Sequence, residues 1–214
     1  MNKKILYVAS GLALIITVIA VVFYLVSGVP VVASDSSITF ANKSYTLKWS
    51  NKNDGGYVNE YLNADETFDN YHTMITIREV TQMKNQLQAA QNLYGVFKQN
   101  TDTGRAFMAS IDQINKDATL VRYCVVAQVP KRNLECNAFN LQQRKSDNVV
   151  MIYQYTQRYF ESELKLTPDN AKNVLNKVES DFNKIKPYIT NVNMPDIVQK
   201  VIDAPASYAY GVKK

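Results

Sequence analysis

An unbroken apolar run near the N-terminus constrains this chain more than any other feature. From Ile5 to Ser34 there is no charged residue, and Ile5 to Val29 is almost wholly apolar. A helix of roughly 25 residues, rising about 1.5 Å per residue, is long enough to cross a hydrocarbon layer about 30 Å thick. We therefore predict one transmembrane helix and assign residues 1–33 as a membrane anchor.

Charged and aromatic residues around this run predict its orientation. Lys3 and Lys4 precede it, and no further lysine or arginine occurs before Lys43. Because such residues are retained on the cytoplasmic side, the N-terminus is expected inside and the rest of the chain outside. Tyr7 and Tyr24 fall near the two expected interfaces, a depth that suits amphipathic rings. The predicted location is the cytoplasmic membrane, crossed once, with the remaining residues on its periplasmic side.

A cleaved signal peptide is the alternative for this segment. Val31, Val32 and Ala33 supply small residues ahead of a polar stretch, as a cleavage site would. The apolar part of a signal peptide, however, is usually about 7 to 15 residues long, well short of the roughly 25 found here. A retained anchor is therefore favoured, and both interpretations export the rest of the chain.

The next residues, 34–203, have the size of one globular domain, and residues 204–214 are predicted to be a mobile tail. Hydrophobic residues make up 46% of the chain and charged residues 20%, which argues against disorder. The two lysines before the apolar run account for two of the 24 basic residues, so 22 remain against 19 acidic ones. A net charge of +3 without a dense basic run argues against nucleic-acid binding.

Strand patterns predominate in the domain, and helices separate two groups of them. Alternating and β-branched residues predict extended segments over residues 38–40, 45–50, 57–62, 106–114, 120–129, 134–142 and 149–160. Apolar stripes at helical spacing predict helices from Gln82 to Lys98 and from Thr167 to Pro187. A last short helix is predicted from Pro195 to Ile202.

One further helix is predicted where the pattern is ambiguous. Asp65 or Thr67 can cap it, but the β-branched residues from Ile75 to Ile77 favour a strand. Sequential strands with helices between them predict an α+β fold, an antiparallel sheet with helices packed on it in the manner of an α-β-α sandwich. The pattern lacks alternating βαβ units, which argues against a parallel nucleotide-binding sheet.

Cys124 and Cys136 are the only cysteines, and they fall on two strands of an expected hairpin near Pro130. A symmetric register places them opposite each other, with Cα atoms about 4.5 Å apart at a non-hydrogen-bonded position. Export makes a disulfide chemically sensible, so we predict one; two buried free thiols are the alternative. A single histidine and the lack of a Cys-x-x-Cys pattern predict no metal site, and we predict no cofactor.

His72 is the only histidine, and acidic residues at positions 60, 65, 66 and 69 precede it. A base and paired carboxylates of this kind could support a hydrolase. The sequence has no nucleophile motif such as Gly-x-Ser-x-Gly, and a partly covered histidine with helix-capping acids explains these residues more simply. We therefore predict no catalytic residue.

Aromatic residues supply the other candidates for binding. Tyr153, Tyr155 and Tyr159 share one face of a predicted strand, and a face of this kind could contact a peptide or glycan. Packing of the rings beneath a helix is the commoner cause. Together with Trp49 and His72, these tyrosines are the possible binding residues.

The stretch from Trp49 to Ile77 resembles a known group of proteins. The run Tyr57 to Leu62, the pair Glu66-Thr67 and the pair Met74-Ile75 look like short exported proteins of Gram-negative bacteria. They are also similar to the Mog1/PsbP-like α-β-α sandwich. The resemblance implies a small, non-catalytic envelope module with no catalytic residue to transfer.

Three functions follow as expectations. The first is a non-enzymatic module, tethered to the cytoplasmic membrane, that binds a protein partner in the bacterial envelope. The second is an envelope hydrolase that uses His72 or the acidic junction over residues 60–69. The third is a lipid or glycan carrier, which requires an apolar or tyrosine-lined cavity.

Overall fold

The computed structural model of the chain describes residues 37–83, 85–102, 104, 106–127, 132–199 and 202. The predicted anchor, with Ile5, Tyr7, Tyr24 and Val29, lies outside these residues, as does the predicted tail over 204–214. Both stay predictions. Within the part of the chain that the structure describes, no helix is both long and apolar enough to cross a membrane.

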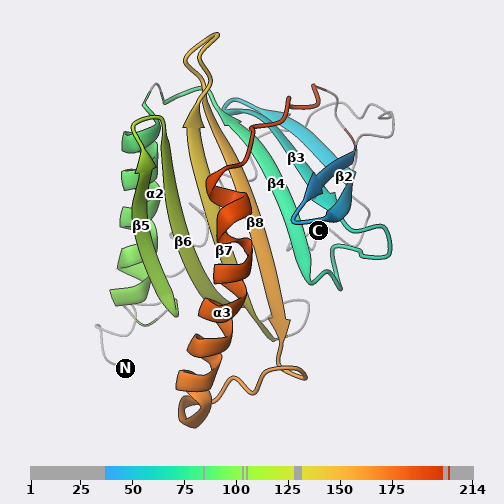
Figure 1. Cartoon of the computed structure of the whole chain (residues 1–214), viewed down its shortest axis with the longest axis vertical. Coiled ribbons are helices and arrows are strands. Elements are labelled where there is room, and N and C mark those ends of the chain that lie inside the picture. Colours follow the sequence, from blue (N-terminus) through green and yellow to red (C-terminus); the bar gives the residue numbers. More distant parts are fainter. Residues whose placement is uncertain are drawn as a thin grey trace, which may run out of the picture.

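Eight antiparallel strands form one sheet in the described residues, and this sheet is the centre of the fold (Figure 1). Its strands are β1 (Ser37–Phe40), β2 (Lys43–Asn53), β3 (Gly56–Leu62), β4 (Thr73–Val80), β5 (Met108–Asn115), β6 (Ala118–Ala127), β7 (Asn133–Gln143) and β8 (Val150–Phe160). Their order across the sheet is β1-β2-β3-β4-β8-β7-β6-β5. Two four-stranded meanders are therefore joined where β4 pairs with β8.

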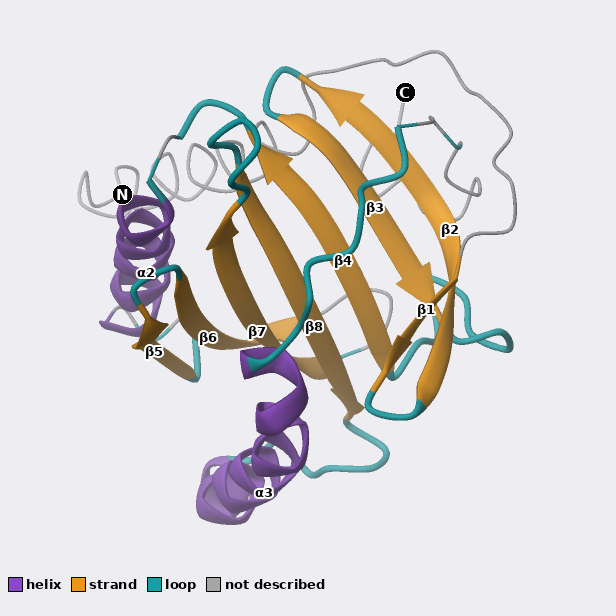
Figure 2. Cartoon of the chain, turned by 45° about the horizontal axis from the view of Figure 1, so that its top comes forward, coloured by secondary structure: helices purple, strands orange, loops and turns teal. Residues whose placement is uncertain are grey.

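A helix covers each face of this sheet. Helix α2 (Gln86–Asp102) connects the two meanders and packs on the face formed by β5 to β8, where it meets Val121, Phe139 and Ile152. A 3-10 turn, η1 (Pro168–Asn170), leads into α3 (Ala171–Thr190), which lies across the opposite face (Figure 2). The predicted α+β fold, with an antiparallel sheet between helices, is confirmed.

Both faces of the central strands are buried, and the sequence of β8 reflects this. Met151, Tyr153 and Tyr155 belong to the core beneath α3, whereas Val150 and Ile152 belong to the core beneath α2. Successive side chains of a strand point to opposite faces, so a strand buried on both sides reads as a continuous apolar run. Val150 to Tyr153 form such a run. Further along β8, the residues on the same face as Ile152 are buried but polar: Gln154, Thr156 and Arg158.

The helix predicted after Asp65 or Thr67 is wrong. Residues 63–72 form a loop with two turns: the amide of Glu66 donates to the carbonyl of Asn63, and the amide of Tyr71 donates to the carbonyl of Thr67. Strand β4 then begins at Thr73 and is buried between β3 and β8. Ladder hydrogen bonds on both sides of β4 outweigh the helical spacing of the aromatic residues.

The boundaries of both long helices also differ from the prediction. The first helix was predicted to start at Gln82, but the amide of Thr81 donates to the carbonyl of Gly55 in the β2–β3 turn. Helix α2 starts at Gln86, and Asn85 caps it by accepting from the amide of Gln88. Pro187 does not end α3, because the next turn buries Ile189 completely in the core. Burial of that side chain offsets the loss of the hydrogen bond that proline removes.

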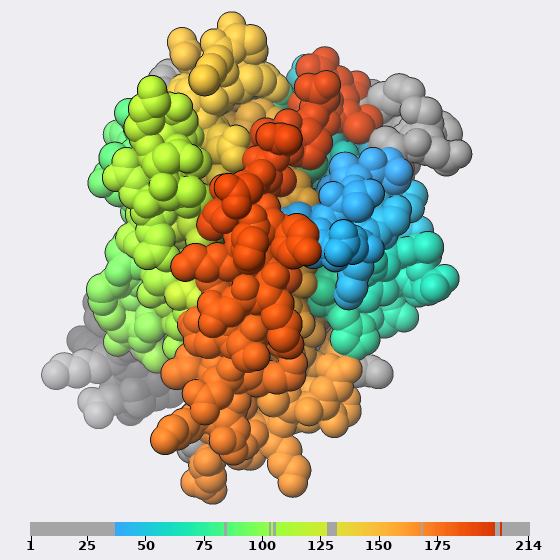
Figure 3. Space-filling view, in the orientation of Figure 1, coloured from blue at the N-terminus to red at the C-terminus, as the bar shows by residue number. Residues whose placement is uncertain are grey.

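The segment after α3 is extended, and the short helix predicted from Pro195 to Ile202 is wrong for the residues described there. This segment crosses the sheet over β8, β4 and β3 (Figure 2). Asn59 anchors it, donating to the carbonyl of Val198 at 3.0 Å and accepting from its amide at 2.6 Å. Ile197 is buried against the sheet, so packing and these bonds favour the extended form. Figure 3 shows α3 and this segment covering the middle of the face.

Candidate functional site

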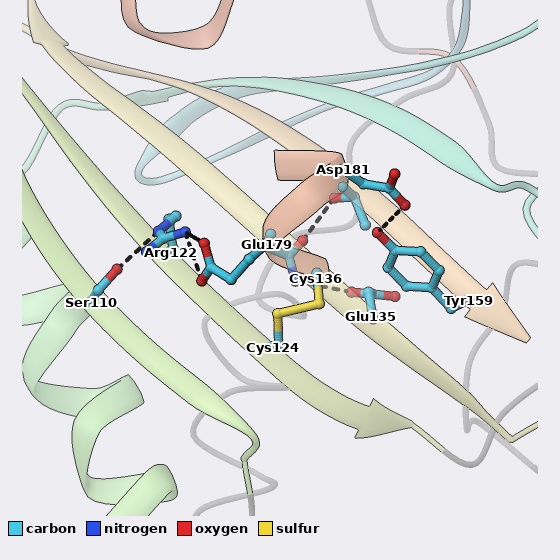
Figure 4. Close-up of a disulfide and its surroundings, with 10 residues drawn as sticks. Ser110, Arg122, Cys124, Glu135, Cys136, Tyr159, Glu179 and Asp181 are labelled. Carbon is cyan, nitrogen blue, oxygen red and sulfur yellow. Dashed lines mark hydrogen bonds and ion pairs between the residues drawn. A yellow bond between two sulfur atoms is a disulfide. The ribbon is translucent and has the colours of Figure 1, made fainter. Parts of the chain in front are cut away.

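The two cysteines form the predicted disulfide. Cys124 on β6 lies directly opposite Cys136 on β7, and their Cα atoms are 4.1 Å apart (Figure 4). The register of the hairpin is symmetric, as predicted. The disulfide is therefore confirmed, and it joins neighbouring strands beneath α3.

An ion pair fixes α3 beside this disulfide. Arg122, on β6, donates two hydrogen bonds to the carboxylate of Glu179 on α3, at 3.1 and 3.0 Å. Its Nε donates to Ser110 on β5 at 3.0 Å, and its guanidinium lies 4.3 Å from the ring centroid of Phe182. One arginine therefore connects two strands to the helix above them.

Asp181 supplies the second polar anchor of α3. Its carboxylate accepts a hydrogen bond from the Tyr159 hydroxyl at 3.1 Å, one from Lys184 at 2.8 Å, and another from Lys177. Burial opposes ionisation of Asp181, but the hydrogen bonds from the two lysines outweigh it and lower the pKa of this carboxyl. Burial, with the nearby carboxylate of Asp181, raises the pKa of Tyr159. In this pair, Asp181 is thus kept as the carboxylate and Tyr159 as the neutral phenol.

The predicted tyrosine face lies in the core. Tyr153, Tyr155 and Tyr159 are all buried beneath α3. The hollow that remains there measures about 30 Å³, room for a water molecule or two. These rings therefore present no open surface to a peptide or glycan.

His72 lies immediately before β4, between two carboxylates. Its Nε2 is 2.8 Å from Glu163 and its Nδ1 is 3.5 Å from Glu66, and the side chain is 53% exposed. Glu66 also accepts from the backbone amide of His72 at 2.8 Å, so this acid fixes the loop before β4. The polar contacts described for the ring are with carboxylates, and none brings a nucleophile to it.

A buried cluster on the sheet face opposite α3 was not predicted from the sequence. Arg158 is 6% exposed, donates to Glu135 at 3.2 Å and to the carbonyl of Phe68 at 3.2 Å, and stacks 3.7 Å from the centroid of Tyr71. Trp49 is partly buried and packs beside it, against the small apolar core that includes Phe68. This cluster fastens the loop over residues 63–72 to the sheet. An arginine within the strand predicted over residues 149–160 was its only signal in the sequence.

Two larger hollows lie near the surface. One of about 250 Å³ is mainly apolar and lies between the start of α3 and β6–β7, beside Leu134, Leu166 and Val174. The other, about 550 Å³, lies among the turns around Gln86, Lys116 and Asp147. His72 lines neither of them. Among the described residues, no group of three or more His, Cys, Asp or Glu side chains is arranged to hold a metal ion.

One edge of the sheet is closed by several means. β1 is only four residues long, and beyond it Ser50 of β2 pairs with Ile202, whose amide donates to the carbonyl of Ser50 at 2.8 Å. Lys43, Lys48 and Lys52 add positive charge along β2. Short edge strands, lysines and covering segments are the usual ways in which proteins prevent unwanted strand pairing.

The other edge, β5, has none of these features. It is eight residues long and contains one charged residue, Asp112, with no lysine, arginine or proline. In the part of the chain that the structure describes, no strand pairs with its outer side. Figure 3 shows residues of this strand, in yellow-green, at the surface beside α3. Among the described residues, β5 is thus a long edge with neither a lysine nor a covering strand, and its one irregularity lies near its end, between Gln113 and Asn115.

The hydrogen-bond pattern shows which backbone groups face outward. The carbonyl of Cys124 accepts from the amide of Phe107 at 2.7 Å, so it points towards β5. Alternation along an antiparallel pair then directs the backbone groups of Ser110 and Asp112 towards β6. The groups that point away from the sheet belong to the residues between and beside them: Ala109, Ile111 and Gln113. The sequence predicted an extended segment here but held no sign that it forms an edge.

Comparison with known proteins assigns the chain to a family. None of the curated proteins matches the chain. Among solved structures, a mutant form of the protein Mog1 is similar, with 9% identity, a TM-score of 0.41, and coverage of 77% of this chain and 97% of that one. The Ran-binding protein Mog1p of Saccharomyces cerevisiae is 10% identical, with a TM-score of 0.38 and coverage of 75% and 96%.

Both TM-scores are below 0.5, so these two likenesses carry no argument about this chain. A protein-family model matches residues 32–194, which is more than half of the chain. The chain therefore belongs to the family that this model describes.

Proposed function

We propose that this chain is a non-enzymatic module of the bacterial envelope that binds a protein partner through the outer side of β5. The open edge is the observation that carries the proposal. An exposed strand offers a row of unpaired N–H and C=O groups, and an extended segment of another protein can complete it as an added strand. The outward groups of Ala109, Ile111 and Gln113 would supply these hydrogen bonds.

Two features support a place outside the cytoplasm. The disulfide between Cys124 and Cys136 persists best in an oxidising compartment. Residues 1–33, with lysines at positions 3 and 4 ahead of an apolar run, are suited to anchor the chain with its sandwich on the outer side. A tether of this kind would hold the β5 edge near partners in or beside the membrane.

The hydrolase and carrier hypotheses have less support. A hydrolase with His72 as the base of a side-chain nucleophile needs that nucleophile within hydrogen-bond reach, and the ring of His72 contacts carboxylates. A carrier needs a pocket of roughly 300 to 1,000 Å³, and the mainly apolar hollow is about 250 Å³.

A photo-crosslinking amino acid in the full chain tests the partner. At Gln113, an exposed residue of the open edge, we expect irradiation of intact cells to give one discrete adduct. The matched control is Lys52, an exposed residue of β2 near the closed edge, which should give none. Equal labelling from both positions, or no adduct from Gln113, would contradict the proposal.

The orientation has its own test. Alkaline phosphatase fused after Lys214 folds only outside the cytoplasm, so the fusion should be active in intact cells. An inactive fusion, paired with an active cytoplasmic reporter at the same position, would refute export.

A further inference from the structure

We infer that the strand completing the β5 edge comes from a second copy of this chain, paired antiparallel to β5 about a two-fold axis at Ile111. This inference rests on the proposed use of the β5 edge and names the partner at that edge. The two sheets would then form one continuous sheet.

The backbone pattern limits the possible registers. Outward-facing residues must oppose outward-facing residues, so Ala109, Ile111 and Gln113 of one copy face the same set in the other. Centring the pair on Ile111 uses all three, with Ile111 opposite its own equivalent and Ala109 opposite Gln113. This register forms about six backbone hydrogen bonds, two for each hydrogen-bonded pair.

Side chains on the α3 side of β5 fit the same register. Met108 would face Ile114 of the second copy, and both are partly buried apolar residues. Asp112 would face Ser110, whose Oγ already accepts from Arg122 at 3.0 Å. The Ser110 hydroxyl therefore keeps its hydrogen to donate to the Asp112 carboxylate. The only charged residue of the strand gains a hydrogen bond.

The neighbouring register of equal length is unfavourable. Moving the axis by one residue, to Asp112, sets this carboxylate opposite its own equivalent, and like charges directly opposed are destabilising. The irregularity of β5 between Gln113 and Asn115 affects the far end of both registers. The charge of Asp112 thus favours the axis at Ile111.

Cysteine pairs in the full, membrane-inserted chain test this register. With the axis at Ile111, the two Cα atoms at this position lie about 5.5 Å apart, within the range that a disulfide spans. Ile111→Cys should therefore give a disulfide-linked dimer on a non-reducing gel. Gln113→Cys is the matched control, because its two copies lie four residues out of register, about 13 Å apart. It should stay monomeric alone and crosslink when co-expressed with Ala109→Cys.

A second measurement does not depend on replacing a partly buried isoleucine. In detergent, light scattering should give the wild-type chain twice its monomer mass of 24.3 kDa. Gln113→Pro removes an outward N–H, costing the dimer two of about six hydrogen bonds, and should weaken dimerisation tenfold or more, on the order of 1.4 kcal/mol or above. Gln113→Ala retains the N–H and should leave the dimer intact.

The outcomes separate this inference from the proposed function. A monomeric wild type, or equal crosslinking of Ile111→Cys and Gln113→Cys alone, would overturn self-pairing. If the Gln113 photo-adduct then has a mass other than twice that of the chain, a different protein occupies the edge and the proposed function stands. If Gln113 gives no adduct at all, both fail.

Discussion

Removing the disulfide should destabilise the folded chain by an amount that the structure sets. Cys124 and Cys136 are 12 residues apart, so the bond closes a short loop in the unfolded chain. The loop-closure model gives about 2.8 kcal/mol for a loop of this length at 25 °C. The folded state changes little, because Cys124 is already buried among Leu134, Val174 and Val178. The bond therefore acts mainly by restricting the unfolded chain.

Urea titration of the full chain in detergent, followed by the fluorescence of Trp49, measures this difference. The comparison needs oxidised wild type, reduced wild type and the double variant Cys124→Ala, Cys136→Ala. The last two should unfold at the same, lower urea concentration, and their melting temperatures should fall by roughly 6 to 11 °C. Reductant should leave the double variant unchanged.

A free-energy difference below about 1 kcal/mol between oxidised and reduced wild type would refute this reasoning. It would mean that the β6–β7 hairpin persists in the unfolded chain and that the bond restricts nothing further. A double variant as stable as the oxidised protein would have the same consequence.

Two further predictions concern a turn and a buried carboxylate. Gly56 has φ of +120°, and an added Cβ would lie 2.5 Å from Cβ of Glu79, so Gly56→Ala should lower the free energy of unfolding by about 2 to 4 kcal/mol in thermal or urea unfolding. Gly95→Ala, in open space on α2, should instead raise it by up to about 1 kcal/mol. Equal effects of the two variants would show that the close approach at Gly56 is absent. Asp181 has a lowered pKa in the folded chain, so its contribution is present above the ordinary value of about 3.9 and is lost as pH falls through the folded value. Unfolding measured from pH 6 down to pH 2.5 should show a weaker pH dependence for Asp181→Asn, and parallel curves would contradict the proposed pairing with Lys177 and Lys184.

Local pattern was enough to predict the hairpins. The patterns over residues 45–50 and 57–62 predicted β2 and β3, and a symmetric register about Pro130 predicted the cysteine pair. These features depend on neighbours in the sequence. The alternation of Tyr45, Leu47 and Trp49 does not continue in the structure, because a bulge between Leu47 and Trp49 puts these two side chains in cores on opposite faces of the sheet. The same local reasoning predicted a helix before β4, because it could not include the ladders on either side of that strand.

The surroundings of the candidate residues depend on contacts between distant parts of the chain. Arg158 meets Glu135 and Phe68 only because β8 lies between β4 and β7. The tyrosines of β8 became core residues once α3 lay over them. No periodicity in the sequence distinguishes such a buried face from an exposed one.

The sequence by itself determined most of the strands, the two long helices, the paired cysteines and an apolar N-terminal run that predicts an anchor, because side-chain periodicity, thiol chemistry and transfer from water act on each segment separately. It mispredicted helices before β4 and after α3, where contacts with distant residues favour other conformations. Only the tertiary structure decided the order of the strands, and so which strand is left as an open edge. Strand order depends on the total burial and hydrogen bonding of all eight strands together. That sum made β5, an ordinary strand in sequence, the surface on which the proposed function rests.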